Sequence, residues 1–151
     1  MQITITSASW NILSAENFSR IVLVTESGEI TVLPGHEPIL SAIRPGIMLV
    51  DYFVGNKIHH AEYATGGWVL NITPETCTIV ADVVENADTL NDIEYIDSQK
   101  KEAERLVKEH RSENGTIIDA KKLIEIEYEL LKYTAMHQLS QKHHMTHGGR
   151  K

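Results

Sequence analysis

The spacing of the apolar residues changes near residue 88, and this change restricts the fold more than any other feature of the chain. Before that point, apolar residues alternate with polar ones in short runs separated by Gly, Pro, Asn and Ser. Such alternation is typical of strands with one buried face. Beyond it, apolar residues recur every three or four positions, as on a helix that buries one side. The order predicts a mainly β domain followed by helices.

The first part of the chain predicts a β-sandwich or a flattened barrel. Gly55-Asn56 lies between two strand-like runs and is a typical hairpin signal. Pro34-Gly35 and Pro45-Gly46 each predict a type II turn, because proline fixes φ and glycine accepts a positive φ. Short strands with frequent turns are typical of antiparallel sheets that fold back on themselves.

The second part, residues 87–151, predicts two helices and ends in a His-rich tail. Ser112-Glu113-Asn114-Gly115 breaks the helical pattern, and Thr116 with Asp119 resembles a capping box at the start of the second helix. A short connection favours an antiparallel hairpin. The polar faces mix Glu and Lys, so mutual packing is favoured over a membrane anchor. We expect this hairpin to be held only loosely to the first domain.

The composition predicts an ordered, soluble and unexported protein. Hydrophobic residues make up 42% of the 151 residues, which is enough for one core. No apolar run approaches the ~20 residues that span a bilayer, and the first residues lack the pattern of a signal peptide. Cys77 is the only cysteine and lies in a strand pattern, so we expect a buried thiol.

The net charge of −7 is concentrated in the first domain. Residues 1–88 hold three basic residues against ten carboxylates, whereas the rest of the chain is balanced. Binding to nucleic acid requires a basic face that meets the phosphates. Nucleic acid is therefore not expected as a partner, and a basic or neutral protein is favoured.

Three segments of the first domain resemble one known family. Residues 28–38 contain Pro34-Gly35-His36, residues 66–68 read Gly-Gly-Trp, and residues 74–82 read Pro-Glu-Thr-Cys-Thr-Ile-Val-Ala-Asp. Together they resemble the epsilon subunit of the F-type ATP synthase. The resemblance continues through the helical tail. It implies a β-sandwich of about ten strands at residues 1–86 and a regulatory two-helix hairpin at residues 87–151.

The resemblance also implies a non-catalytic rotor subunit without a cofactor. In that family the sandwich binds the gamma subunit and the c-ring, coupling proton- or sodium-driven rotation to ATP synthesis. The helices can inhibit ATP hydrolysis and reach the alpha and beta subunits. We therefore expect a peripheral protein on the cytoplasmic side of the energy-coupling membrane, without direct membrane insertion. The residues expected to face the c-ring are Glu29, Pro34, Gly35, His36 and Glu37.

Some members of the family bind ATP through an Ile/Leu-Asp-x-x-Arg-Ala motif at the start of the first helix. In the aligned register Ile93 is kept, but Glu94, Asp97 and Ser98 replace the Asp, Arg and Ala. A carboxylate in place of a phosphate-binding guanidinium turns attraction into repulsion. A register shifted to Ile96-Asp97 places lysines at the last two motif positions. ATP binding is therefore not expected.

The histidines offer little sign of catalysis. His36 beside Glu37 could form an acid–base pair, but no nucleophile motif or phosphate loop accompanies them. His59 and His60 are neighbours in a strand-like run, so their rings should point to opposite faces.

No metal site is predicted either. His143, His144 and His147 have a spacing that a helix could bring to one face, but no acidic or cysteine ligand follows them. Two alternatives to a rotor subunit stay open. One is a free-standing β-sandwich module that binds another protein, and the other is an enzyme of unknown type.

Overall fold

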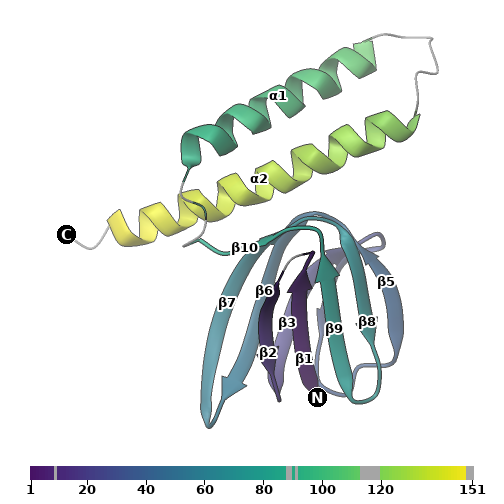
Figure 1. The fold of residues 1–151 in the computed structure, drawn as a ribbon, viewed down its shortest axis with the longest axis vertical. Helices are drawn as coiled ribbons and strands as arrows, with labels where there is room; N and C mark the ends of the chain where they lie inside the picture. The colour runs from purple at the N-terminus through teal and green to yellow at the C-terminus, as the bar shows by residue number, and fades with distance from the viewer. Residues whose placement is uncertain (9, 88–89, 91, 113–119, 149–151) are drawn as a thin grey trace.

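The computed structural model shows a β-sandwich with a helical hairpin packed on one of its ends (Figure 1). It describes residues 1–148 except 9, 88–89, 91 and 113–119, and it describes side-chain surroundings for all of these except 110–112, 120 and 143–148. The strands are β1 (Gln2–Ser7), β2 (Asn11–Ala15), β3 (Phe18–Thr25), β4 (Gly28–Val32), β5 (Ile39–Ile43), β6 (Gly46–Val54), β7 (Lys57–Thr65), β8 (Trp68–Ile72), β9 (Thr76–Ala81) and β10 (Val84–Glu85). The helices are α1 (Ile93–Ser112) and α2 (Ala120–Gly148).

This architecture confirms the predicted fold class, a sandwich of about ten strands followed by an antiparallel pair of helices. α1 ends at Ser112, where the breaking segment begins. The rest of that segment and the predicted capping box of Thr116 and Asp119 lie outside the described residues. The domain boundary at residue 86 stays a prediction.

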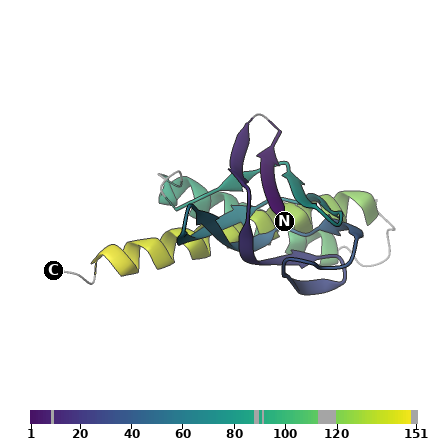
Figure 2. The same ribbon diagram turned by 90° about the horizontal axis from the view of Figure 1, so that it is seen from below.

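A single curled sheet makes both layers of the sandwich. Its strand order is β10-β7-β6-β3-β5-β8-β9-β1-β2, and β4 pairs with β3 beside this path. β1 and β9 are parallel, and the other pairings among the described strands are antiparallel. Figure 2, seen from the end opposite the helices, shows both helices behind the strands and α2 extending past them.

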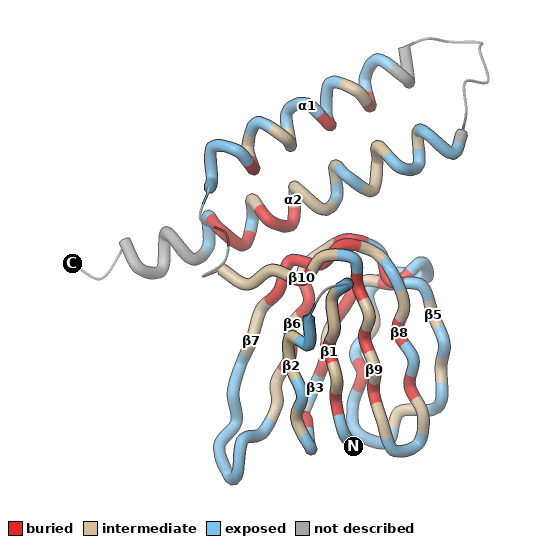
Figure 3. The backbone as a smooth tube through the Cα atoms, in the orientation of Figure 1, coloured by how far each residue is buried: buried red, intermediate tan, exposed pale blue. Residues whose placement is uncertain are grey.

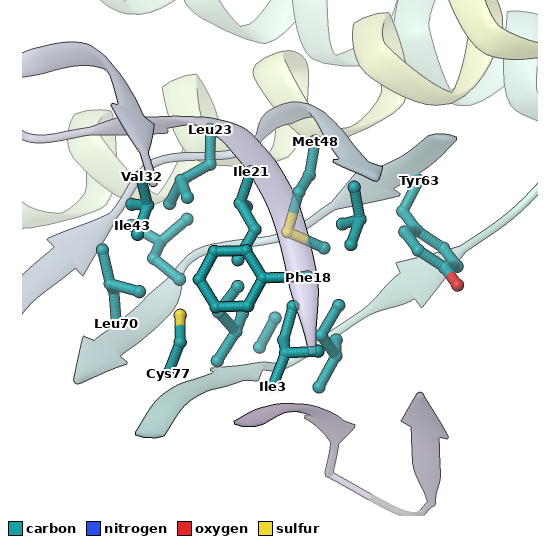
Figure 4. Close-up of a cluster of buried hydrophobic side chains, with 14 of the residues drawn as sticks. Ile3, Phe18, Ile21, Leu23, Val32, Ile43, Met48, Tyr63, Leu70 and Cys77 are labelled. Atoms are coloured by element: carbon teal, nitrogen blue, oxygen red, sulfur yellow. The ribbon is translucent and has the colours of Figure 1, made fainter. Parts of the chain in front are cut away.

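The core lies between the two layers and is built from every second residue of the strands. Ile3 and Ile5 of β1, Cys77 and Ile79 of β9, and Ile21 of β3 are almost completely buried. Figure 4 shows such side chains converging around Phe18. The prediction for Cys77 is confirmed, and burial raises the pKa of its thiol to about 12, so the thiolate is disfavoured.

One of the two predicted type II turns is present. The N–H of His36 donates to the carbonyl of Leu33 at 3.0 Å, and Gly35 has a φ of 84°, as the third residue of such a turn requires. The turn predicted at Pro45-Gly46 is wrong. Gly46 begins β6 opposite Thr65 and does not have a positive φ. A Cβ on Gly46 would lie 3.2 Å from Cγ2 of Val24, so space rather than conformation favours this glycine.

The hairpin packs on the sandwich through α2, while α1 lies on the far side of α2 (Figure 1). Figure 3 shows buried residues on α2 where it crosses the ends of the strands. A second apolar cluster, which we call the docking cluster, forms there. Its buried members are Ala64, Leu90, Ile96, Ala135, Met136 and Leu139.

Candidate interaction surfaces

The connection between β4 and β5 forms an exposed loop at the end of the sandwich opposite the helices. The Pro34-Gly35 turn lifts His36 and Glu37 out of the strands. Nδ1 of His36 lies 2.8 Å from the backbone carbonyl of Glu37. Because a carbonyl only accepts, this contact requires the proton on Nδ1, and in the neutral ring Nε2 can then accept a hydrogen bond from a partner. The ring contacts the backbone rather than the carboxylate, so this geometry does not support the acid–base pair.

The structure separates Glu29 from the four other residues predicted to face the c-ring. Glu29 pairs with Val24 beside the β3–β4 turn, whereas Pro34 to Glu37 follow the other end of β4. Val32 lies three positions after Glu29 along the strand, a rise of about 10 Å, before the loop begins. The neighbouring Glu26 contacts α2, so Glu29 lies toward the helical end of the sandwich. The contact of these five residues with the c-ring stays a prediction.

The outer face of β1, β5, β8 and β9 carries no charged side chain. The inward positions of these strands fill the core, so the alternate positions face outward. Leu40 is 74% exposed there. In a chain with 23% charged residues, such a face has the composition of a protein-binding surface, where charge is depleted. The outward residues are Gln2, Thr4, Thr6, Leu40, Ala42, Val69, Asn71, Thr76, Thr78 and Val80.

The outer face of β3, β6 and β7 is polar by contrast. Asp51 accepts from Nε of Arg20 at 3.2 Å and lies 2.7 Å from Nδ1 of His60. His59 points the other way and stacks on Tyr52, with 5.5 Å between the ring centroids. The prediction that the two histidines face opposite sides is confirmed. Their partners are a carboxylate for His60 and an aromatic ring for His59.

Polar contacts hold α2 to the sandwich on both sides of the docking cluster. Toward its N-terminal end, the hydroxyl of Tyr128 donates to the carboxylate of Glu26, and this hydrogen bond raises the pKa of Tyr128. Toward its C-terminal end, Nζ of Lys142 donates to Glu62 at 2.6 Å. Neither contact leaves a local signal in the sequence, since 102 and 80 residues separate the partners.

The four degenerate nucleotide-motif positions do not form a pocket. Ile93 and Glu94 are exposed, and the hydroxyl of Ser98 donates to the carbonyl of Tyr95 at 2.8 Å. Asp97 lies 3.0 Å from Nζ of Lys101, and the hydrogen bond from this lysine lowers the pKa of the carboxyl.

A cavity of about 300 Å³ lies beside them, between the start of α1 and the middle of α2. None of the four motif positions lines it. Its walls come from Tyr95 and Ile96 on α1, Tyr133 and Met136 on α2, and the strand connection around Val83. The cavity is therefore largely apolar and aromatic, with Lys132 as its one basic wall residue among Glu85 and Asp92.

Among the described residues, neither helix combines the length and apolarity that a bilayer span needs. Within the same part of the chain, no three potential metal ligands come together. α2 runs through His143, His144 and His147 to Gly148, but the surroundings of these side chains are not described. The absence of a metal site there stays a prediction.

Comparison with known proteins identifies one family. The sequence profile described as ATP synthase, Delta/Epsilon chain, beta-sandwich domain matches residues 1–87. The ATP synthase epsilon chain of Psychrobacter arcticus is 33% identical over 107 residues, covering 71% of this chain and 75% of that protein. The epsilon chain of Xylella fastidiosa is 30% identical over 102 residues, covering 68% of this chain and 67% of that protein.

Two solved structures share the fold. A chain of the Euglena gracilis mitochondrial ATP synthase OSCP/F1/c-ring structure superposes with a TM-score of 0.66 at 23% identity, covering 90% of this chain and 78% of that one. A chain of the Tetrahymena thermophila mitochondrial ATP synthase central stalk/c-ring structure gives a TM-score of 0.56 at 17% identity and 95% coverage of both chains.

Proposed function

This chain belongs to the delta/epsilon family of ATP synthase subunits, and from that premise we propose that it is a non-catalytic subunit of the central stalk. In this role it joins the c-ring to the gamma subunit, so that ion-driven rotation of the ring is passed to the catalytic head. A close-packed sandwich suits the task, because its interior transmits strain instead of absorbing it. We expect a peripheral location on the cytoplasmic side of the energy-coupling membrane.

The uncharged sheet face is the observation that carries the proposal. It gives the sandwich one broad surface on which a protein can pack without desolvating ions, which is costly unless each ion finds a partner. We assign this face to the gamma subunit. The polar face of β3, β6 and β7 stays toward solvent, where Arg20, Asp51 and His60 keep their hydration.

The β4–β5 loop is the proposed contact with the c-ring. It places Nε2 of His36 and the carboxylate of Glu37 at an exposed end, where they can meet the polar loops of the ring. Electrostatic and hydrogen-bond complementarity of this kind sets register and specificity more than affinity. Glu29 lies toward the helical end of the sandwich. It can join the same contact only if the c-ring also covers part of β4.

The helical hairpin is the proposed regulatory part. The docking cluster is much smaller than the sandwich core, and the polar contacts of Tyr128 and Lys142 lie at the surface. Elements with few buried apolar contacts open at low free-energy cost. Released from the sandwich, the hairpin could extend toward the alpha and beta subunits and impede ATP hydrolysis. No nucleotide cofactor is expected to control this step, because the motif positions lack the phosphate-binding arginine.

Co-purification with the gamma subunit tests the assignment of the sheet face. Leu40→Glu places a charge on the β5 side of the proposed interface and should abolish capture of gamma. The matched control is Ile124→Glu on α2, where the side chain is 53% exposed, and it should leave capture intact. If both variants still capture gamma, this face is excluded as the gamma-binding surface. Failure of the unmodified chain to bind gamma or a c-ring would favour the free-standing binding module instead.

A further inference from the structure

The tip of the β6–β7 hairpin is an exposed apolar surface. Phe53 and Ile58 form a cross-strand pair, and Val54 lies directly before the Gly55-Asn56 turn. These three side chains are 38%, 44% and 57% exposed, respectively. The tip projects at the end of the sandwich opposite the helices (Figure 1). None of the three side chains belongs to the sandwich core or packs against it.

The charge of this tip differs from that of the acidic domain around it. Residues 52–60 contain Lys57 and no carboxylate. Asp51 is engaged by Arg20 and His60. It also lies about 10 Å along the strand from Val54, which exceeds the screening length of about 8 Å at physiological salt. The β2–β3 connection brings Glu16 close to the tip, because the carbonyl of Asn17 accepts from the N–H of Phe53 at 3.0 Å. The N-terminal ammonium of Met1 donates to the side chain of the same Asn17 at 3.2 Å, so a cation accompanies this carboxylate and Lys57 is the charge of the turn itself.

We propose that this tip contacts the anionic headgroup layer of a lipid bilayer. Apolar side chains flanking a basic residue are how peripheral proteins enter a membrane surface, because the apolar groups leave water while the cation meets lipid phosphates. The β4–β5 loop at the same end carries Glu37 and has the opposite charge. The two parts of this end therefore suit different surfaces, a polar protein loop and a lipid headgroup layer.

The orientation of the tip toward the membrane rests on the proposed function, but its affinity for lipid does not. In the proposed assembly the c-ring holds the sandwich close to the bilayer, so even weak affinity of a three-residue tip contributes. The tip then acts as an outer support on the side of the sandwich away from the β4–β5 loop.

Fluorescence of the full chain with lipid vesicles tests the proposal. A polarity-sensitive dye is attached to Val54→Cys, and Leu40→Cys on the uncharged sheet face is the matched control. Both sites are exposed and apolar, and the buried Cys77 should not react. With phosphatidylcholine vesicles containing about 30% phosphatidylglycerol, the dye at position 54 should shift to the blue while the dye at position 40 does not.

Charge reversal gives the second readout. Each basic residue near an anionic surface contributes about fivefold in affinity, so Lys57→Glu should weaken vesicle binding by roughly 20-fold. Lys121→Glu, an exposed lysine on α2, should leave it unchanged. Equal responses at positions 54 and 40, or none at lipid concentrations on the order of 10 mM, would overturn the proposal. So would cross-linking of position 54 to a protein of the assembled synthase without any vesicle response. We expect Lys57→Glu to capture gamma normally whether or not the tip binds lipid. Failure of this proposal is therefore distinguishable from failure of the proposed function.

Discussion

Gly66→Ala is expected to destabilise the protein through one carboxylate. A Cβ on Gly66 would stand 1.7 Å from Oδ1 and 2.6 Å from Cγ of Asp82. The side chain of Asp82 would have to swing away, and the N–H of Val83, which donates to Oδ1 at 2.7 Å, would lose its partner. A hydrogen bond of this kind contributes about 1–2 kcal/mol net. We therefore expect the free energy of unfolding to fall by about 1–2 kcal/mol.

A double-mutant cycle isolates the steric cause. The three atoms nearest to the added Cβ all belong to the carboxylate of Asp82, so Asp82→Ala removes them. Gly66 does not have a positive φ, so alanine brings no left-handed strain and restricts the unfolded chain. In the Asp82→Ala background, Gly66→Ala should therefore be neutral or stabilising by up to about 1 kcal/mol. Urea titrations of the four proteins, followed by circular dichroism, measure the difference. An equal cost of Gly66→Ala in both backgrounds would refute the reasoning.

Three further outcomes follow from the division of the chain and its surfaces. A truncation to residues 1–86 should keep β-sheet circular dichroism and gamma binding; an unfolded product would show that the sandwich needs the docking cluster. Glu29→Lys with His36→Glu should leave the melting temperature unchanged but weaken the coupling of ATP hydrolysis to ion pumping in the reconstituted complex, and normal coupling would remove both residues from the c-ring contact. Isothermal titration should find ATP binding no tighter than roughly 1 mM, about −4 kcal/mol, whereas Asp97→Arg with Ser98→Ala should increase affinity. Tight binding by the unmodified chain would require a site built from other residues.

The fold could be predicted wherever short-range pattern determines it. The alternation around Ile3 and Ile79 and the turn at Gly35 are local signals, and the structure has the strands and the turn at those places. The turn predicted at Gly46 was wrong because Pro-Gly is a common turn signal. Here the glycine is favoured because Val24, on another strand, lies very close to where a Cβ would be. A pattern cannot show that kind of neighbour.

The candidate surfaces depended on register, which the sequence determines only indirectly. The motif includes both Glu29 and His36, and antiparallel pairing to β3 places Glu29 beside the β3–β4 turn while His36 follows the other end of β4. The sequence does contain a signal for the uncharged face. The outward positions of β8 and β9, such as Val69, Asn71 and Thr78, are all uncharged. These positions become one surface only when β8, β9 and β1 pair side by side, and the sequence alone does not show that pairing.

The parallel pairing of β1 with β9 has a consequence for the order in which the molecule forms. Ile3 lies beside Cys77, so the first strand can find its final neighbour only after more than half of the chain has been synthesised. Until then β1 can pair only with β2, and the apolar side chains of Ile3 and Ile5 stay exposed to water. Closing so long a loop costs chain entropy before the contacts between β1 and β9 can stabilise the product, and this makes folding slow. The helices leave the ribosome after β9, so they can meet a sandwich that has already closed.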